Sequence, residues 1–369
     1  MEIKLLKSKN LEAFLNSEEF RKMPNIPISE HRAISHLKNP ALEENDIILL
    51  LCYIDDIFAG YLGTLPDNLN IKGKKKHIAW LSCLWVNPQM RRKGVAAGLL
   101  SKAHELWEKD LLIVNFTPHA KKAYDKLNSF IEFTSYRGVR TYLRMNLHKL
   151  QLQKNPANKK YEFPLKIFDI VFNLFNDLRL MFFNYKKTLK NITAEKINEI
   201  DSDTYSLIEN HNKNDIVKRD KDSLNWIIKY PWMLQGDPNS KEAKRYEFSS
   251  FSKKFKFESF RLKDNENNIF CFLMFNLRDR HLKIPYFYCN SEKQHLALRF
   301  IYSYLLKNKV NYLTVFNPRL KESIYNYSSP FFLKRELTRT YLITKKLKAG
   351  IPEEQEIIFR DGDGDSAFT

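Results

Sequence analysis

The residues of this sequence best suited to chemistry form a short basic loop, Arg91-Arg-Lys-Gly-Val-Ala96, in which three cationic side chains precede a glycine. An apolar run ends just before it at Val86, and a segment with helical spacing, Gly94–Trp107, follows it. The first amides of a helix lack intrahelical acceptors and carry the positive end of the helix dipole, so they favour an anion. Gly94 and Ala96 have little or no side chain, so phosphate oxygens can approach the backbone. The loop therefore predicts a pyrophosphate site.

Other phosphate-binding and catalytic motifs fit the sequence less well. A Walker A loop is absent, and a dinucleotide fingerprint needs G-x-G-x-x-G, whereas only Gly94 and Gly98 occur here. The sequence also lacks a G-x-S-x-G elbow and an H-E-x-x-H zinc spacing. The C-terminal Asp361-Gly-Asp-Gly-Asp365 alternates like the opening of a calcium loop, but no acidic residue follows to close it. We therefore predict no metal site and interpret the acidic tail as a flexible or docking segment.

The elements around the basic loop alternate in a defined order. Apolar runs bounded by turn residues predict antiparallel strands before the loop and a short buried strand after the helix. A proline near the start of the next segment is compatible with the first turn of a helix that continues to about Leu127. The predicted strands are Ile47–Tyr53, Ile57–Leu65, His77–Val86, Leu111–Phe116 and Arg140–Leu147.

The second half of the sequence repeats this pattern. Phe116-Thr-Pro118 is echoed by Phe316-Asn-Pro318, and Arg140-Thr-Tyr-Leu143 by Arg339-Thr-Tyr-Leu342, at nearly the same spacing. Two matches in the same order and in the same predicted context indicate a duplicated fold. The copies differ at the basic loop, where the second has Asn290–His295 without a glycine.

Val86-Asn-Pro88, then Arg91-x-x-Gly94-x-Ala96, then an apolar helix, resembles the acetyl-CoA-binding motif of the GNAT (Gcn5-related N-acetyltransferase) superfamily. The good match covers Ile47–Leu147, although Asn128-Ser-Phe130 stands where the family usually has Gly-Phe. The resemblance implies an α+β fold with a mixed sheet, made of two GNAT-like domains that are each a mostly antiparallel sheet flanked by helices. We expect an acyl-CoA-binding domain, a helical connector, a degenerate second domain and an acidic tail, at residues 1–148, 149–193, 194–347 and 348–369.

The resemblance also implies a mechanism. Acyl-CoA would lie where His77–Val86 and Leu111–Phe116 splay apart, and a bulge near Leu84–Val86 would free backbone groups for the pantetheine arm. An amine would attack the thioester directly, and Tyr124 holds the family position of the acid that protonates the departing thiolate. The implied co-substrate is acetyl-CoA or another acyl-CoA, without a metal. The implied binding residues are Leu84, Trp85, Val86, Arg91, Arg92, Lys93, Gly94, Val95 and Ala96.

The general base is left open by the sequence. Many relatives carry a glutamate on the central strand, but Ile78–Val86 has no acidic residue. Glu132, His119 or a water chain are the candidates. The missing acid also permits the alternative of a non-catalytic GNAT-like binding or scaffold protein at a membrane surface or an acidic polymer.

The acceptor would be a small-molecule or protein amine. The second domain has no phosphate loop, so we expect it to contribute to the acceptor pocket. Two of its segments are aromatic and polar enough to line such a pocket, and two segments before the first long strand hold the family's usual acceptor-shaping position. These segments are Arg219–Trp226, Tyr230–Trp232, Ile28–Arg32 and Asn39-Pro40.

Composition limits the class of protein. The 369 residues, 43% of them hydrophobic, suit two domains. The net charge of +18 is spread along the chain without an accompanying nucleic-acid-binding motif, which favours a solvated lysine-rich surface over a nucleic-acid interface. Three of the four cysteines lie in apolar strands, no signal pattern opens the chain, and no apolar run could span a bilayer, so we expect a cytoplasmic protein.

The connector contains an apolar stretch, Leu165–Tyr185, with basic residues on both sides. A long helix packed between the two domains would have this composition, and so would an interfacial helix on an anionic membrane. We favour the packed helix, with peripheral membrane contact as the competing interpretation.

Overall fold

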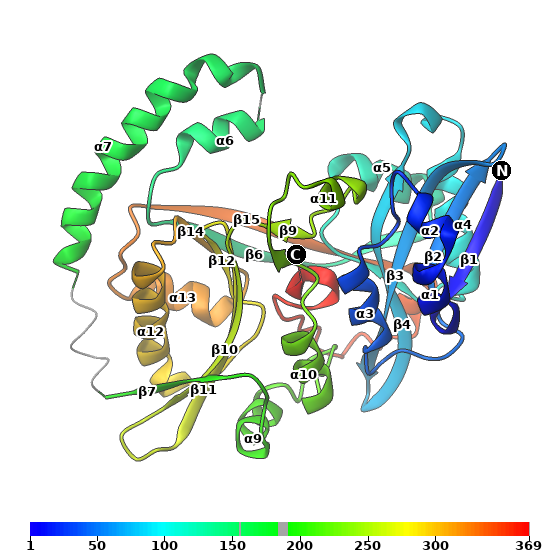
Figure 1. The fold of residues 1–369 in the computed structure, drawn as a ribbon. Coiled ribbons are helices and arrows are strands. Elements are labelled where there is room, and N and C mark those ends of the chain that lie inside the picture. The colour runs from blue at the N-terminus through cyan, green and yellow to red at the C-terminus, as the bar shows by residue number, and fades with distance from the viewer. Residues whose placement is uncertain (155, 184–190, 369) are drawn as a thin grey trace.

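One continuous sheet of thirteen strands runs through both halves of the molecule. Figure 1 shows most of its strands, with the helices around them. The computed structural model describes residues 1–154, 156–183 and 191–368. The strand order is β1-β2-β3-β4-β5-β15-β6-β14-β12-β11-β10-β7, with β13 paired to β11. Neighbouring strands are antiparallel except for two parallel pairs, β4 with β5 and β12 with β14. The protein thus has the expected mixed α/β fold, a mostly antiparallel sheet flanked by helices.

The first half contains the elements that surround the basic loop. Successive side chains of each strand point to opposite faces of the sheet, so each strand contributes side chains to the packing on both faces. The elements are β1 (Glu2–Lys7), α1 (Ser8–Asn16), α2 (Glu18–Lys22), α3 (Glu30–Leu37), β2 (Ile47–Ile54), β3 (Ile57–Ile71), β4 (Lys74–Val86), η1 (Pro88–Met90), α4 (Val95–Leu106), β5 (Leu111–Ile113), α5 (Pro118–Leu127) and β6 (Phe130–Tyr142).

The second half repeats the order of elements after a helical connector. The connector is α6 (Leu147–Lys154), η2 (Pro156–Tyr161) and α7 (Glu162–Met181). The elements that follow are β7 (Thr193–Ile197), α9 (Ser202–His211), α10 (Lys221–Lys229), β8 (Leu234–Gln235), α11 (Lys241–Arg245), β9 (Phe251–Ser252), β10 (Phe255–Lys263), β11 (Ile269–Arg278), β12 (His281–Lys283), β13 (Phe287–Cys289), η3 (Ser291–Lys293), α12 (Gln294–Lys307), β14 (Tyr312–Val315), α13 (Pro318–Asn326), β15 (Leu333–Thr344), α14 (Lys345–Ala349) and η4 (Gly364–Ala367).

The repeat inferred from the sequence has a structural counterpart. The two Phe-x-Pro segments each connect a short strand to a helix, β5 to α5 and β14 to α13, and the two Arg-Thr-Tyr-Leu segments begin within β6 and β15. The parallel strand pairs fall at matching places, so the order of pairings reads alike from either edge of the sheet.

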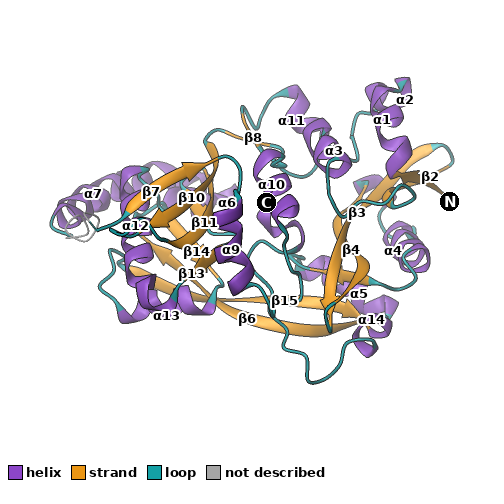
Figure 2. Ribbon diagram, turned by 90° about the horizontal axis from the view of Figure 1, so that it is seen from below, coloured by secondary structure: helices purple, strands orange, loops and turns teal. Residues whose placement is uncertain are grey.

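The long strands β6 and β15 are exchanged between the halves, and both views show them running across the molecule (Figures 1 and 2). In the second half, β15 pairs with β5 of the first half through Leu342 and Ile113. In return, β6 pairs with β14 through Val139 and Val315. Each of the ranges 1–148 and 194–347 therefore completes the sheet of the other, although the ranges themselves stay a prediction.

Of the two interpretations of the acidic tail, flexible or docking, the flexible one is wrong. Asp361, Asp363 and Asp365 lie in the middle of the molecule, where Figure 1 places the C-terminus between the two halves. Each carboxylate accepts hydrogen bonds from different partners: the Phe316 amide at 2.6 Å for Asp361, the Tyr286 hydroxyl at 3.2 Å for Asp363, and the Ser82 hydroxyl at 2.8 Å for Asp365.

An aromatic side chain completes this anchor. The ring of Phe368 stacks on that of Trp232, with the centroids 4.5 Å apart, and meets the ring of Trp226 edge-on. Phe368 is 2% exposed and belongs to the central hydrophobic core, which contains side chains of both halves. Burial of this ring and of the paired carboxylates explains why the alternating glycines and aspartates form an ordered segment.

The expectation of a connector helix packed between the halves is also wrong. Figure 1 shows α7 on the outside of the second half, together with α6. Its side chains include several of the most exposed large apolar residues of the chain, such as Phe163 at 73% and Phe175 at 67%. The end of the predicted apolar stretch, Tyr185, and the basic residues Lys186, Lys187 and Lys190 lie outside the described residues.

Candidate active site

The basic loop directly precedes the N-terminus of α4 and is exposed to solvent. Gly94 is the N-cap residue with φ +82°, a left-handed conformation that favours glycine, and no side chain caps the helix. Arg91, Arg92 and Lys93 are exposed in front of these amides, whereas Val95 is buried and fixes the first turn against the core. The residues predicted to bind a pyrophosphate are therefore together at an uncapped helix end.

The corresponding turn of the second half is built differently. The N-cap residue of α12 is Lys293, whose φ of −101° needs no glycine. Its ammonium lies 2.5 Å from the carboxylate of Asp264, so its charge is already paired. The two halves thus share a fold but differ at the position where an anion would bind.

Strand β4 carries the irregularity expected near its end. The pairing of β3 with β4 shifts register between Tyr61 and Gly63, so Leu62 faces two residues of β4. These are Cys83 and Leu84, and Cys83 has φ +58°. A bulge of this kind leaves backbone groups out of the ladder and redirects the strand. Leu84, Trp85 and Val86 lie at this bulge, as expected.

Beyond the bulge, β4 and β5 separate. Their parallel pairing ends at Leu81 and Ile113, and no ladder pairs join the described residues that follow. The carboxylate of Asp365 lies across this gap: it accepts from the Ser82 hydroxyl at 2.8 Å and from the Asn115 side-chain amide at 3.2 Å. The C-terminal segment therefore holds one side of the opening in which the resemblance places a thioester.

Tyr124 approaches the opening from the opposite side. Its ring packs in the core under α4, and Ala79 and Leu81 of β4 point into that core. Trp80 points to the other face, and Ser82, two residues further on, shares that face by strand alternation. Burial raises the pKa of the Tyr124 hydroxyl, and the nearby charge of Asp365 raises it further. A phenol and a carboxylate thus flank the gap between the strands.

A cavity of about 240 Å³ opens beside Asp365. It is lined by residues of both halves: Arg32, Cys83, Asn115, Trp232, Met233, Tyr246, Phe248, Ser249, Arg278, Asp365 and Phe368. Of the four segments that we expected to shape an acceptor pocket, Ile28–Arg32 contributes Arg32 and Tyr230–Trp232 contributes Trp232. Arg219–Trp226 and Asn39-Pro40 contribute no lining residue among those described.

Arg32 organises the floor of this cavity. Its guanidinium donates to the Cys83 sulfur at 2.5 Å and to the Tyr246 hydroxyl at 2.7 Å, and it lies 3.9 Å from the Trp232 ring centroid. The side chain is buried, so these contacts fix the bulge of β4 from the cavity side. The guanidinium also contributes a positive charge that acts against the burial that raises the pKa of Asp365.

Asp365 is the functional candidate that the sequence did not reveal. Glu132 and His119, the two side chains considered as bases, are exposed and do not line the cavity. Asp365 is separated from Ser82 by most of the chain, and its Asp-Gly alternation points to a turn rather than to a site. Burial raises its pKa, the direction that a proton acceptor with a stronger affinity for a proton requires.

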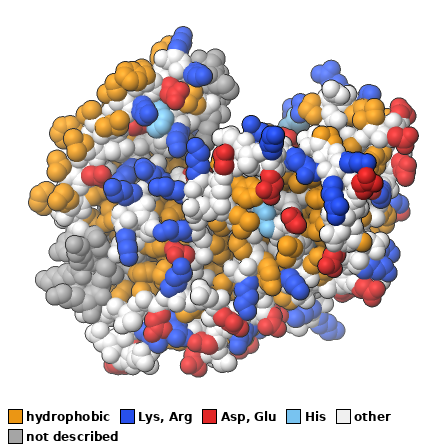
Figure 3. All heavy atoms as spheres, in the orientation of Figure 1, with side chains coloured by type: hydrophobic (Ala, Val, Ile, Leu, Met, Phe, Trp, Pro, Cys, Tyr) orange, Lys and Arg blue, Asp and Glu red, His pale blue; other side chains and the backbone are white. Residues whose placement is uncertain are grey.

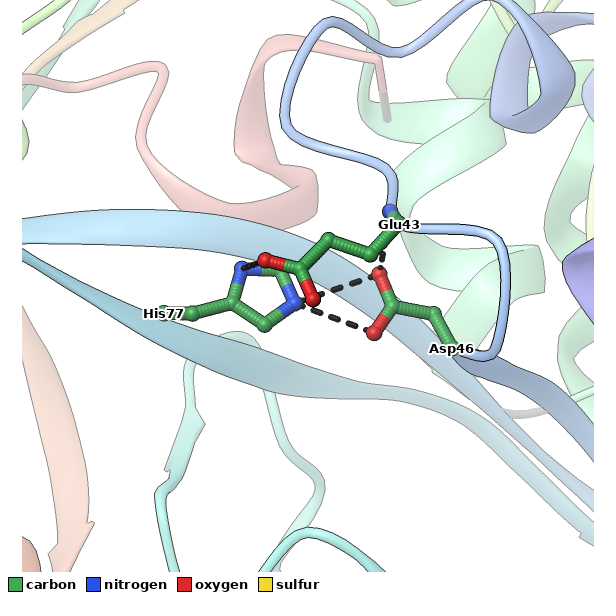
Figure 4. A group of neighbouring side chains, drawn as sticks. All are labelled: Glu43, Asp46 and His77. Carbon is green, nitrogen blue, oxygen red and sulfur yellow. Dashed lines mark hydrogen bonds and ion pairs between the residues drawn. The ribbon is translucent and has the colours of Figure 1, made fainter.

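A second polar group lies elsewhere on β4. Figure 4 shows Glu43, Asp46 and His77 close together, with His77 Nε2 3.0 Å from an Asp46 oxygen. Asp46 also accepts from the backbone amide of Glu43 at 2.8 Å, which closes the loop before β2. Hydrogen bonding to Asp46 raises the pKa of His77. The group fastens this loop to β4, and none of its three residues lines the 240 Å³ cavity.

Comparison with known proteins finds one family model that matches part of the first half. Residues 10–128 match the model of the acetyltransferase (GNAT) domain, which contains the basic loop and Tyr124. No curated protein sequence matches the chain significantly.

Solved structures resemble the chain over nearly its whole length. A conserved protein of unknown function from Enterococcus faecalis V583, titled "Probable N-Acyltransferase", has a TM-score of 0.52 at 9% identity, covering 94% of this chain and 73% of its own. N-myristoyltransferase of Saccharomyces cerevisiae with bound myristoyl-CoA has a TM-score of 0.51 at 10% identity, covering 93% of this chain and 78% of its own. A GCN5-related N-acetyltransferase from Anabaena variabilis has a TM-score of 0.50 at 11% identity, covering 92% and 72%. At these identities the likeness establishes a common fold.

Proposed function

We propose that this chain, whose residues 10–128 match the acetyltransferase (GNAT) domain, transfers an acetyl or other acyl group from acyl-CoA to an amine by direct attack. The match to the GNAT domain supports acyl transfer in general. The observation that carries the finer proposal is the placement of Tyr124 and Asp365 on opposite sides of the gap between β4 and β5. The myristoyl-CoA bound by the N-myristoyltransferase of similar fold supports acyl-CoA as the donor.

The loop would bind the diphosphate of the coenzyme. Uncapped amides of α4 would donate to phosphate oxygens, and the three exposed cations before them would add attraction. The pantetheine arm would then follow the edge of Leu84–Val86 that faces away from β3, where the pairing with β5 has ended. The thioester carbonyl would be polarised by backbone groups released by the bulge at Cys83.

Two side chains would move the protons of the reaction. Asp365 takes a proton from the attacking amine as the C–N bond forms, and Tyr124 gives its phenolic proton to the CoA sulfur as the C–S bond breaks. The protons balance, since one is removed from the nitrogen and one is delivered to the thiolate. A tyrosine is protonated at neutral pH, and burial raises the pKa of Tyr124 further, so the phenolic proton is in place before the C–S bond breaks.

The acceptor amine would enter through the 240 Å³ cavity. Asp365 offers its carboxylate to an ammonium there, and the aromatic rings of Trp232, Tyr246 and Phe248 surround the same space. A cavity of this size admits a small amine or the end of a lysine side chain. Because both halves line it, the second half contributes to acceptor binding without a phosphate loop of its own.

Acetyl-CoA should stabilise the folded chain. At about one hundred times its dissociation constant, a ligand that binds only the folded state adds roughly 2.7 kcal/mol to the free energy of unfolding. Thermal unfolding with and without acetyl-CoA measures this shift. Turnover is measured with a panel of small amines, by monitoring the CoA thiol that acetyl transfer releases. A chain that neither shifts nor releases thiol would contradict the proposal.

A glycine substitution tests the loop directly. Gly94→Ala should weaken acetyl-CoA binding by about tenfold, because an alanine at φ +82° costs roughly 1–2 kcal/mol and the loop would relax away from the binding conformation. Gly73→Ala is the matched control, since Gly73 has φ +79° in the exposed turn between β3 and β4 and, as at Gly94, an added Cβ meets nothing within 4 Å. Titration calorimetry of both variants decides: equal affinities would remove the loop from the coenzyme site.

A further inference from the structure

The connector helix α7 packs on the protein through its polar face and exposes its apolar face. Its polar side chains face the protein: Asp169 accepts from the Leu147 amide at 2.9 Å, and the Asn176 amide donates to the Leu143 carbonyl at 2.7 Å. Between them, Asn173 hydrogen-bonds both backbone groups of Met145, at 2.8 and 3.0 Å. These polar contacts attach the helix to the body of the protein, and its apolar side chains are left on the outside.

The outer face of α7 carries many exposed apolar side chains. Figure 3 shows hydrophobic side chains along the outer edge of the molecule at the upper left, where Figure 1 places α7. A helix of twenty residues is about 30 Å long, so this surface has the dimensions of a large docking site. We call it the α7 face; its exposed side chains are Phe163, Ile167, Phe168, Ile170, Val171, Leu174, Phe175, Leu178, Met181 and Phe182.

A shallow hollow continues the α7 face toward α6. It measures about 510 Å³, and its lining includes the apolar side chains of Pro164, Leu165 and Phe168 together with Tyr161. Soluble proteins rarely expose apolar areas of this extent without a partner. The helices among the described residues include none long and apolar enough to cross a bilayer.

The charges around the α7 face select the partner. Lys159, Lys160 and Lys166 are exposed at the N-terminal end of the face. Of the acidic residues of α7, Asp169 is buried, Asp177 pairs with Arg144 at 2.6 Å although its side chain is 47% exposed, and Glu162 is partly exposed near the three lysines. The exposed surface is therefore apolar with a cationic border, in a chain whose net charge is +18.

We propose that the α7 face binds the surface of an anionic lipid bilayer, with the helix lying in the interface. Apolar side chains on one face and lysines at its border are the two contributions that hold such helices on membranes. A second copy of the chain fits less well, because a symmetric pairing of the two faces would bring the same lysines and two strongly positive chains together. The polar anchors of α7 fix the helix so that it is presented outward.

Co-sedimentation of the full chain with vesicles tests the proposal. We expect binding to vesicles of phosphatidylcholine and phosphatidylglycerol in equal parts, and much weaker binding to phosphatidylcholine alone. The triple variant Leu174→Gln, Phe175→Gln, Leu178→Gln introduces good helix formers and should lower the partition coefficient by about 1,000-fold, since burial of each large apolar side chain contributes about tenfold or more.

Single variants provide the control. Leu174→Gln on the α7 face should lower vesicle binding, whereas Ile57→Gln, at the exposed turn between β2 and β3, should not; the two side chains are 63% and 52% exposed. Both variants should unfold at the wild-type temperature. Wild-type protein that stays in the supernatant with anionic vesicles would overturn the proposal. Self-association in analytical ultracentrifugation without lipid, abolished by the triple variant, would also overturn it in favour of a second copy. Neither vesicle binding nor self-association depends on acyl transfer. A negative result in these experiments would therefore leave the proposed acyltransferase function untouched, and loss of that function would leave the membrane proposal untouched.

Discussion

Asp365→Asn is expected to lower kcat by about 10²–10⁴-fold, the range found when a positioned proton-transfer group is removed. The asparagine keeps an oxygen for the Ser82 hydroxyl but cannot take a proton from the amine. Affinity for acetyl-CoA should stay close to the wild-type value, because the loop at α4 lies apart from this carboxylate. Steady-state kinetics with a responsive amine, beside titration calorimetry of the coenzyme, separate the two effects.

The pH dependence identifies the base. Asp365 must be ionised to act, and burial raises its pKa, so kcat/KM of the wild type should rise with pH through an acidic limb, at a higher pH than an unperturbed aspartate would give. In the asparagine variant this limb should vanish, and Asp365→Glu should restore part of the rate. Glu132→Gln is the control, since Glu132 is exposed on β6. An acidic limb that persists in Asp365→Asn, or a loss of rate in Glu132→Gln, would assign the base elsewhere.

Arg219→Met is expected to destabilise the folded chain by about 3–5 kcal/mol, the cost of removing one partner of a buried ion pair. Arg219 is 4% exposed and donates to both oxygens of Asp67 at 2.8 Å, and its Nε lies 3.5 Å from an oxygen of Asp363. These contacts link the segment before α10, strand β3 and the C-terminal segment in one network. Urea denaturation of the variant measures the loss.

The network also sets the sign of a pH effect. Burial raises the pKa of Asp363 to about 7, and Arg219 acts in the opposite direction. Without the guanidinium the folded-state pKa is higher, so the folded variant keeps its proton to a higher pH than the folded wild type. The deficit in unfolding free energy should therefore grow as pH rises above about 7 and be smallest below it. Lys229→Met, which breaks the exposed pair with Glu199, should cost less than about 1 kcal/mol. Similar losses for both variants would contradict the role given to the buried network.

Local patterns in the sequence predicted the loop and the helix end that we propose as the coenzyme site. The strand that ends at Val86, the glycine at Gly94 and the helix after it are determined by residues that are neighbours in the chain, so turn chemistry and periodicity are enough to find them. The repeated Phe-x-Pro and Arg-Thr-Tyr-Leu segments likewise predicted the matching strand–helix units of the two halves. These features require no knowledge of distant contacts.

The acceptor side depends on contacts between distant residues. Asp365 meets Ser82 and Asn115 only because the C-terminal segment returns to the centre of the sheet, and no local pattern encodes that return. The exchange of β6 and β15 was missed for the same reason, since either strand has the alternation needed to pair in either half. The outward face of α7 was misjudged because a helix with one apolar and one polar face does not reveal which face the protein covers.

The account rests on acyl-CoA entering the gap between β4 and β5, and a crystal structure with bound acetyl-CoA tests this most directly. The account predicts the diphosphate at the amides that follow Gly94, and the thioester sulfur in the gap with the Tyr124 hydroxyl and the Asp365 carboxylate on opposite sides of the carbonyl. Coenzyme bound elsewhere at saturating concentration, or a thioester on the far side of either residue, would contradict it.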